Sequence, residues 1–396
     1  MNQHPLIKQA DDAFSSGNNT LGLDKLRRFS QTDQADAQSW NRLAIVEEQI
    51  GEWTNAGIAH FECINSAPYI GISYLYAAYW LEQSKLNDAA ASVYSLAQET
   101  DARILDFSSF LENPQLARRS RAGNFLLRSY LSNQHRRLFD QANTTSRIAK
   151  AIWPQTHDSA IQFGSELFSP QLFYIRGLTE KPYYEVDEFE WAEHLTKHSQ
   201  TIKNELSAVL SSTTSDAALR PYLSQQFSGE PSLRKLAGSN NWSAMDLYRN
   251  GELNDDLSNS FPKTLELIQN LPCYGLDSSP FEVFFSVLKP KQEISKHFGE
   301  SNHSLTVHLA LDIPSDCYLE VAGEKRRWVE NELVAFDDSF LHSAHNTSDQ
   351  RRIVLILSVW HPSLSETEKA AIQLSFKTRQ QWMLNRTNKL KSLLPS

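Results

Sequence analysis

The chain has 396 residues, of which 40% are hydrophobic and 21% charged, and its formal net charge at pH 7 is −9. These values are typical of a globular protein, so they argue against wholesale disorder, and the length favours two domains over one. The acidic balance and the absence of a long basic run argue against nucleic acid or an anionic membrane surface as the main partner.

The three cysteines, Cys63, Cys273 and Cys317, lie far apart in the sequence and form no CxxC pair. Neither a zinc cluster nor a disulfide framework is therefore indicated, and a reducing compartment is expected. The first residues lack the apolar core of a signal peptide, and no apolar run approaches the ~20 residues that a membrane span needs. We therefore expect a cytoplasmic protein without a membrane segment.

The first third of the chain, from Leu6 to about Asp106, has small and apolar residues at helical spacing. Two sets of residues match the tetratricopeptide repeat consensus: Trp40, Leu43, Ala44, Ala56 and Pro68, and then Tyr74, Ala77, Ala78 and Ala90. Small residues let paired helices approach closely, and stacked neighbours bury faces that one pair cannot bury alone. The segment is similar to a tetratricopeptide array, which would serve as a peptide-binding surface or, equally well, as a helical cap or dimerisation platform.

Residues 118–151 are expected to add one or two helices, and the helical pattern fades at Trp153-Pro154. The next segment, 166–280, is dense in aromatic residues and prolines and indicates no chemistry by itself. At the other end of the chain, residues 366–394 are predicted to form one long helix. Its first turn is acidic and its end is basic, as the helix dipole favours.

Between Phe281 and Pro362, short apolar runs alternate with turn residues. The runs are Thr306–Leu311, Cys317–Val321, Leu333–Phe336 and Ile353–Val359. This rhythm is typical of an antiparallel β barrel or sandwich of short strands. Several of the chain's 12 histidines are concentrated in the same stretch.

His297 and His342 each lie at the end of an apolar run, so they could meet across the mouth of a barrel. Two neutral imidazoles suit divalent iron, copper or zinc. In the facial triad of non-haem iron oxygenases, a carboxylate two residues after the first histidine completes the set, but here that position is Gly299. From spacing alone, either water fills the third place, or Glu300 reaches in, or no metal binds.

The stretch also carries a series of specific motifs. In chain order they are Trp242, Ser286, His297-Phe298-Gly299, Leu305–Leu309, Trp328, Phe336-Asp337-Asp338-Ser339-Phe340, Arg352 and Trp360-His361-Pro362. Together they resemble the aspartyl/asparaginyl β-hydroxylase family of 2-oxoglutarate-dependent oxygenases. The resemblance covers roughly residues 165–375, and members of the family also carry helical repeats before the catalytic domain.

The resemblance implies an iron site. Members of the family bind Fe(II) through two histidines without a carboxylate ligand, so Gly299 agrees with their pattern, and His297 and His342 would be the iron ligands. Asp338 would hold a metal-bound water or orient an iron ligand. We assign it the catalytic role on that basis.

The resemblance also implies a site for 2-oxoglutarate as cosubstrate. Arg352 would pair with one of its carboxylates, a geometry that a guanidinium suits, while Arg351 should point to the opposite face of the strand. Ser286 would hydrogen-bond the same carboxylate, and His308 would also contact the cosubstrate. One position departs from the family, because several members carry an arginine where this chain has Thr306. The absence of that arginine would weaken cosubstrate binding, shift the binding to His308 or mark a subfamily with a different pocket.

Three other histidines receive no role in the chemistry. We expect His303 and His345 to lie in exposed loops, and His361 to be structural, closing the barrel beside Trp360. Templates of other enzyme classes fit poorly, because the sequence has no GxSxG elbow, no glycine-rich phosphate loop and no HExxH.

The expected fold is α+β. It comprises a tetratricopeptide-like helical domain over residues 1–155, a double-stranded β-helix (jelly-roll, cupin-like) domain with flanking helices over 156–375, and a C-terminal helix over 366–396. The implied activity is hydroxylation of the β-carbon of Asp or Asn in a peptide, protein or amino acid, which the repeats would help to hold, with release of succinate and CO2. The alternative, favoured by Thr306, is a non-catalytic repeat-based protein-binding scaffold with a degenerate barrel.

Overall fold

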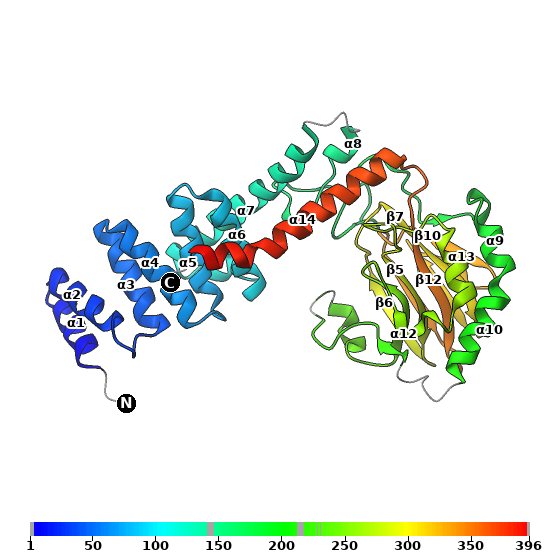
Figure 1. Cartoon of the computed structure of the whole chain (residues 1–396), viewed down its shortest axis with the longest axis horizontal. Helices are drawn as coiled ribbons and strands as arrows, with labels where there is room; N and C mark the ends of the chain where they lie inside the picture. Colours follow the sequence, from blue (N-terminus) through cyan, green and yellow to red (C-terminus); the bar gives the residue numbers. More distant parts are fainter. Residues whose placement is uncertain (1–3, 141–145, 212–217, 228, 230, 394–396) are drawn as a thin grey trace. The chain divides into compact units, whose positions relative to one another are not determined.

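The computed structural model describes residues 4–140, 146–211, 218–227, 229 and 231–393 (Figure 1). Its Cα positions separate into two compact units, one of residues 1–134 with 378–396 and one of residues 135–377. Each unit has its own hydrophobic core. The domain limits expected from the sequence stay a prediction, because compactness alone does not define functional domains. In the described part of the chain, no helix is long and apolar enough to cross a membrane.

The first unit is built from helical hairpins. In chain order its helices are α1 (Pro5–Ser15), α2 (Asn19–Ser30), α3 (Ala37–Ile50), α4 (Trp53–Ser66), α5 (Gly71–Gln83) and α6 (Asn87–Thr100), followed by the short η1 (Phe107–Phe110). Consecutive helices pack as the pairs α1–α2, α3–α4 and α5–α6. The small residues expected at the repeat positions are buried, among them Ala44, Ala56, Ala77 and Ala90. The helical-repeat prediction is therefore confirmed.

Local sequence explains where these helices begin and how closely they pack. At the start of α3, the Asp36 side chain accepts from the Ser39 N–H while the Ser39 hydroxyl accepts from the Asp36 N–H, a reciprocal capping box. Gly51 ends the helix in the left-handed conformation at φ 83°. In α4, a Cβ at Gly57 would lie 2.3 Å from the Trp80 ring, so only glycine permits this close approach of α4 and α5.

Two long helices connect the units along the chain. Helix α7 (Pro114–Asp140) begins in the first unit and ends in the second, and α14 (Glu366–Leu393) begins in the second and ends in the first. The predicted C-terminal helix is thus confirmed over its described residues. The second unit also contains α8 (Ser146–Ala149), η2 (Pro154–Thr156), η3 (Val186–Glu188), α9 (Ala192–Lys197), α10 (Ser199–Leu210), η4 (Pro231–Leu236), α12 (Asp255–Ser258) and α13 (Pro262–Gln269).

The core of the second unit is a pair of antiparallel sheets. The larger sheet has the order β1 (Tyr183–Tyr184), β10 (Leu333–Phe336), β7 (Ser304–Asp312), β12 (Arg352–Trp360), β5 (Glu282–Leu288), β3 (Trp242–Arg249) and β2 (Arg220–Pro221), with β4 (Glu252–Leu253) paired to β3. The smaller sheet has the order β6 (Gln292–His297), β11 (His342–Asn346), β8 (Cys317–Val321) and β9 (Glu324–Arg327). All four apolar runs predicted as strands are strands.

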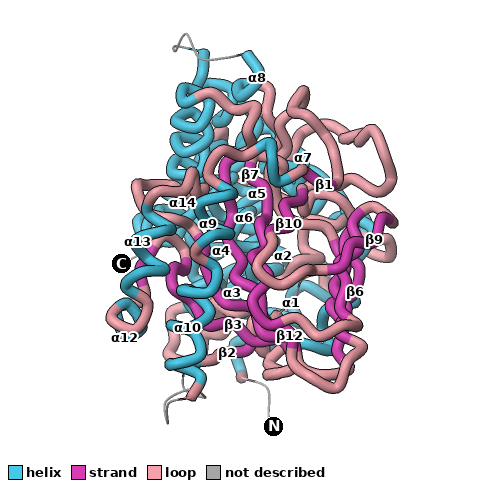
Figure 2. The backbone as a smooth tube through the Cα atoms, turned by 90° about the vertical axis from the view of Figure 1, so that its right-hand side faces the viewer, coloured by secondary structure: helices cyan, strands magenta, loops and turns pink. Residues whose placement is uncertain are grey.

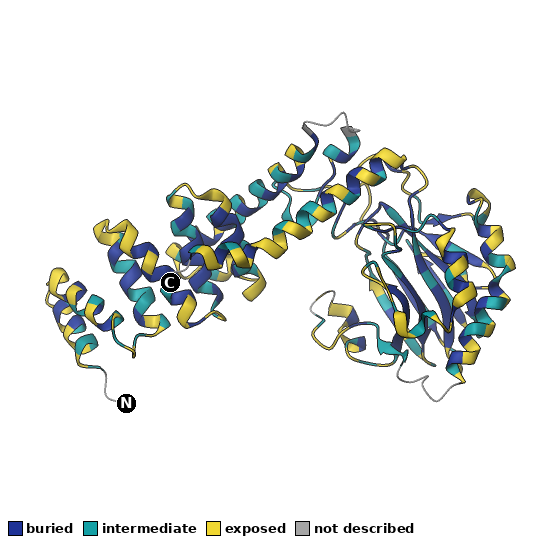
Figure 3. Cartoon of the chain, in the orientation of Figure 1, coloured by how far each residue is buried: buried dark blue, intermediate teal, exposed yellow. Residues whose placement is uncertain are grey.

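Side chains alternate between the two faces of the larger sheet, and each face has its own core. On one face, Leu305, Val307 and Leu309 of β7 pack with apolar residues of α9, α10 and α13, which lie beside the strands in Figure 2. On the other face, Ala310 and neighbouring strand residues pack against Ile294, Leu319 and Ala344 of the smaller sheet. Figure 3 shows the buried residues gathered along these strands. Two facing antiparallel sheets are the expected jelly-roll architecture.

Candidate active site

The two histidines predicted at strand ends lie together. Antiparallel pairing of β6 and β11 sets His297 directly opposite His342. Their ring centroids are 4.1 Å apart and the ring planes are tilted by 53°. Two imidazoles at this separation can contact one ion, so the structure brings together the pair on which the iron prediction depends.

Backbone contacts fix which nitrogen of each ring is available as a ligand. Nδ1 of His297 lies 2.7 Å from the Ser295 carbonyl oxygen, and Nδ1 of His342 lies 2.9 Å from that of Phe340. A carbonyl oxygen can only accept, so Nδ1 is the donor and Nε2 carries the lone pair in the neutral ring. Burial lowers the pKa of His342 to about 4, because it disfavours the charged form. His342 is therefore neutral near pH 7, as a metal ligand must be.

The Asp338 carboxylate occupies the space that a side chain at Gly299 would take. A Cβ built on Gly299 would lie 2.3 Å from the carboxyl carbon of Asp338, and the Gly299 N–H donates to the Asp338 carbonyl at 2.6 Å. The Thr306 hydroxyl donates to Oδ2 of Asp338 at 3.0 Å. Burial raises the pKa of Asp338 to about 6. Glu300 is exposed, and over the described ranges no cluster of three or more His, Cys, Asp or Glu side chains could hold a metal ion.

Arg352 is a buried cation without a carboxylate partner among the described residues. The residue is 1% exposed, and its Nη1 donates to the Ser286 carbonyl at 3.3 Å and to the Ser286 hydroxyl at 3.2 Å. Within the described ranges its Nε has no hydrogen-bond partner. Burial lowers its pKa to about 10, yet it remains charged at pH 7. An uncompensated buried charge is costly, so this position favours an anionic ligand. Arg351, which immediately precedes β12, is exposed.

Trp328 supports both Arg352 and His308. Its Nε1–H donates to His308 Nδ1 at 3.3 Å, and the Arg352 guanidinium lies 5.0 Å from its ring centroid. Since Nδ1 accepts, the single proton of the neutral His308 ring is on Nε2. Burial and the nearby Arg352 charge hold the pKa of His308 well below its ordinary value, so the ring is a neutral donor at pH 7.

Ser286 is arranged to donate to a ligand. Its Oγ accepts from Trp242 Nε1 at 3.1 Å and from Arg352 Nη1 at 3.2 Å. These two contacts use the hydroxyl as an acceptor, which leaves its proton for another group. Arg352, His308 and Ser286 therefore present N–H and O–H donors from β12, β7 and β5 of one sheet. Sequence reasoning gave Trp242 and Trp328 no role in this arrangement, although both stood among the matching motifs.

Comparison with known proteins places these residues in a family. Residues 196–362 match the family model described as "Aspartyl/Asparaginyl beta-hydroxylase". Over these residues, hereafter the β-hydroxylase domain, the chain is similar to that family. The mouse "Aspartate beta-hydroxylase domain-containing protein 2" is 27% identical over 293 residues, which cover 72% of this chain and 81% of the relative.

Two human relatives match shorter segments. The human "Aspartyl/asparaginyl beta-hydroxylase" is 26% identical over 212 residues, 52% of this chain, and the match spans only 26% of that protein. The human "Aspartate beta-hydroxylase domain-containing protein 1" is 33% identical over 133 residues, 33% of this chain and 34% of its own length. The match therefore spans only about a quarter to a third of the length of each of these two relatives.

Within the β-hydroxylase domain, the prediction for His303 was wrong. The side chain is 2% exposed and lies among the rings of Phe173, Tyr274, Trp360 and Phe376. Neither ring nitrogen has a hydrogen-bond partner among the described residues. His303 lies in a turn as expected, so only its exposure was wrongly predicted. His345, in contrast, is not in a loop, because it lies on β11, half-buried and stacked on Tyr318 at 4.5 Å between ring centroids.

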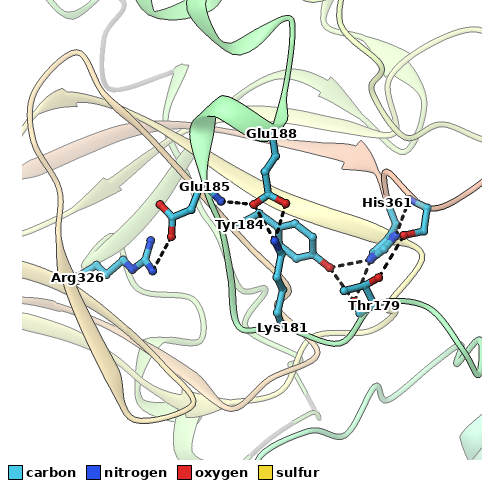
Figure 4. A network of polar contacts seen from close by, with 8 residues as sticks. Thr179, Lys181, Tyr184, Glu185, Glu188, Arg326 and His361 are labelled. Atoms are coloured by element: carbon cyan, nitrogen blue, oxygen red, sulfur yellow. Dashed lines mark hydrogen bonds and ion pairs between the residues drawn. The ribbon is translucent and has the colours of Figure 1, made fainter.

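His361 is structural, as predicted, and Figure 4 shows its contacts. Its Nδ1 accepts from the Ser363 N–H at 3.1 Å, so Nε2 carries the proton and lies 2.7 Å from the Tyr184 hydroxyl. Tyr184 in turn donates to the Thr179 carbonyl at 2.7 Å. Because Tyr184 belongs to β1, which pairs with β10, this chain of hydrogen bonds braces the strand that leads into the Asp337-Asp338 turn of the β-hydroxylase domain.

Proposed function

We propose that the β-hydroxylase domain is an Fe(II)- and 2-oxoglutarate-dependent dioxygenase that hydroxylates a carbon of its substrate. The observation that carries this proposal is the combination of a buried guanidinium without a carboxylate partner among the described residues and two paired histidines. The Phe336 ring lies 5.1 Å from the His308 ring and 5.6 Å from the His342 ring, between ring centroids, and burial and the nearby Arg352 charge lower the pKa of His308. A dicarboxylate held by Arg352 would accordingly lie close to a metal held by His297 and His342.

The residues fit Fe(II) in the way the family pattern implies. Two imidazoles whose Nδ1 atoms face backbone carbonyls, so that Nε2 would be the ligand atom, are suitable donors for divalent iron. Two protein ligands leave several coordination positions for cosubstrate and water, and Asp338 lies beside Gly299 to receive a hydrogen bond from such a water. Bound iron would supply the redox chemistry that couples oxidative decarboxylation of 2-oxoglutarate, to succinate and CO2, to hydroxylation of the substrate carbon.

The chain's own part in the reaction is to bind and orient the cosubstrate. Arg352 would pair with a carboxylate, while Ser286 Oγ–H and His308 Nε2–H would donate to cosubstrate oxygens. Hydrogen bonds to charged groups contribute about 1.5–3 kcal/mol each, and burial of Arg352 excludes the water that would compete for them. The cosubstrate would also neutralise the charge of Arg352, which lacks a carboxylate partner among the described residues.

The substrate is proposed from the names of the relatives. They are aspartate or aspartyl/asparaginyl β-hydroxylases, so the proposed target is the β-carbon of Asp or Asn in a peptide, protein or amino acid. The hairpins of the helical unit would bind peptide segments of such a substrate. Fold similarity does not fix substrate choice, which depends on groups at the site mouth.

One experiment tests the proposal. Protein purified anaerobically is mixed with Fe(II) and 2-oxoglutarate, oxygen is admitted, and succinate is measured. We expect turnover by the wild-type protein, loss of turnover in His342→Ala, and retention in His345→Ala, which removes a histidine of the same strand that stacks on Tyr318. If neither 2-oxoglutarate binding nor succinate is found with the wild-type protein, the scaffold alternative replaces the oxygenase.

A further inference from the structure

Thr306 stands where several family members carry an arginine, and the structure gives it a different partner. We propose that Thr306 is a positioning residue that holds the Asp338 carboxylate toward the His297–His342 pair. This inference rests on the proposed function, because it concerns the metal site of the same reaction. In this proposal Thr306 orients the Asp338 carboxylate near the metal ligands and does not bind the cosubstrate.

Strand register places Thr306 next to the turn that carries Asp338. On β7, Thr306 pairs with Phe336 of β10 and with Ser358 of β12. Its neighbours Leu305 and Val307 point into the helix-covered core, so Thr306 points to the opposite face, toward the smaller sheet. Asp338 follows Phe336 by two residues, which brings its carboxylate within 3.0 Å of the Thr306 hydroxyl.

Asp338 is held at three points, and these leave one oxygen for a ligand. Its carbonyl accepts from the Gly299 N–H, its carboxylate lies in the space beside Gly299, and its Oδ2 accepts from Thr306. Oδ1 is the oxygen nearest to the position of a Gly299 Cβ, at 2.3 Å. Gly299 follows His297 by two residues, and Asp338 precedes His342 by four. The oxygen not bonded by Thr306 is thus held beside Gly299, in the loop that follows His297.

The hydroxyl suits this task better than an arginine would. An arginine at 306 would form an ion pair with Asp338 and reduce its negative charge toward a cation at the histidines. A threonine hydroxyl donates one hydrogen bond, orients the carboxylate and leaves its charge in place. The stiff χ1 of a β-branched residue in a strand adds to the precision of this contact.

The test measures Mn(II) binding by calorimetry in wild-type protein, Thr306→Val and Thr306→Ser. Valine keeps the shape and removes the donor, so we expect about tenfold weaker binding, at the low end of the effect of losing an outer-shell partner of a metal site. Serine keeps the donor and should bind within about threefold of the wild-type protein. The visible spectrum of bound Co(II) should change in Thr306→Val and be restored in Thr306→Ser.

A double-mutant cycle shows whether Thr306 acts through Asp338. In an Asp338→Ala background, Thr306→Val should cause no further loss of Mn(II) affinity. Equal affinity and an unchanged Co(II) spectrum in Thr306→Val would overturn the inference, as would additive losses in the cycle. Thr306→Ala provides a second donor-free variant if the valine variant does not fold. A failure of the proposed function gives a different result: if the protein had no metal site, the wild-type protein and His342→Ala would bind Mn(II) equally weakly.

Discussion

The indole nitrogen of Trp328 donates a hydrogen bond to Nδ1 of His308 across 3.3 Å. This single contact selects the tautomer of His308 in which Nε2–H faces the site. The Trp328 ring also lies under the Arg352 guanidinium. One buried tryptophan therefore supports two of the donors proposed for the cosubstrate, the neutral His308 and the charged Arg352. Cosubstrate binding should therefore depend on a residue that need not touch the cosubstrate.

We expect Trp328→Phe to weaken 2-oxoglutarate binding about fivefold, which corresponds to the loss of a hydrogen bond worth about 1 kcal/mol. Without the indole donor, either nitrogen of His308 can carry the proton, so part of the population presents an acceptor to the carboxylate. Calorimetry with Mn(II) present measures the change in affinity. The control is Trp191→Phe, in a residue that packs against the helix-covered core. Equal 2-oxoglutarate affinities of all three proteins would show that Trp328 does not set the tautomer.

Arg352→Met should separate stability from cosubstrate binding. It removes a buried charge that lacks a carboxylate partner among the described residues, so we expect the ligand-free protein to gain about 1–3 kcal/mol of stability and a higher Tm. The same variant should lose detectable 2-oxoglutarate binding, because it lacks the guanidinium. Differential scanning fluorimetry with and without 2-oxoglutarate measures both effects.

The adjacent Arg351→Met is the matched control for this prediction, because Arg351 is exposed. It should change Tm little and leave cosubstrate binding intact. A lower Tm of Arg352→Met without ligand would mean that the contacts of Arg352 with Ser286 and Trp328 outweigh the cost of burying its charge.

The strands and the histidine pair were predictable because they depend on local pattern. Cys317–Val321 and Leu333–Phe336 are strands with the predicted bounds, since turn residues delimit each run. The positions of His297 and His342 at strand ends indicated that they could meet, and the register of β6 against β11 sets them opposite each other. Arg352 is buried while its neighbour Arg351 is exposed, which is compatible with the expectation that the two side chains point in opposite directions.

Contacts between distant segments were not predictable in this way. The Thr306–Asp338 hydrogen bond depends on the register of β7 against β10, which the sequence of either strand leaves open. The burial of His303 was missed for a related reason: His303 lies in a turn, as its neighbours indicate, but the turn is covered by other segments. The aromatic rings that cover it come from residues up to 130 positions away in the chain, such as Phe173.

Gly299→Ala should displace the Asp338 carboxylate. The added Cβ would lie 2.3 Å from the carboxyl carbon and 2.8 Å from the carbonyl oxygen of Asp338, so the turn must shift. We expect a loss of about 1–3 kcal/mol of stability, typical of overpacking, together with weaker Mn(II) binding. Chemical denaturation and calorimetry measure the two effects. Gly164→Ala is the control, since a Cβ there meets its nearest atom only at 4.0 Å. If Gly299→Ala changed stability and Mn(II) affinity as little as Gly164→Ala, the observed packing would be contradicted.

His303→Leu should make the protein more stable, and more so in acid. The imidazole is buried among aromatic rings without a hydrogen-bond partner in the described part of the chain, so an apolar side chain of similar size avoids a desolvation cost of about 1–3 kcal/mol. Burial also lowers the pKa of His303 to about 3 from its ordinary 6.5. The unfolded chain therefore binds a proton that folded His303 does not bind between these two values.

The sign of the pH effect follows from this difference in bound protons. Stability falls as pH decreases below about 6.5, and at pH 5 the loss from His303 alone should be about 2 kcal/mol. His303→Leu removes this component, so urea denaturation should show a larger advantage of the variant at pH 5 than at pH 8. His194→Leu, in an exposed histidine of α9, should show no such advantage. A constant difference between His303→Leu and the wild-type protein across this range would mean that folded His303 takes up its proton as readily as the unfolded chain does.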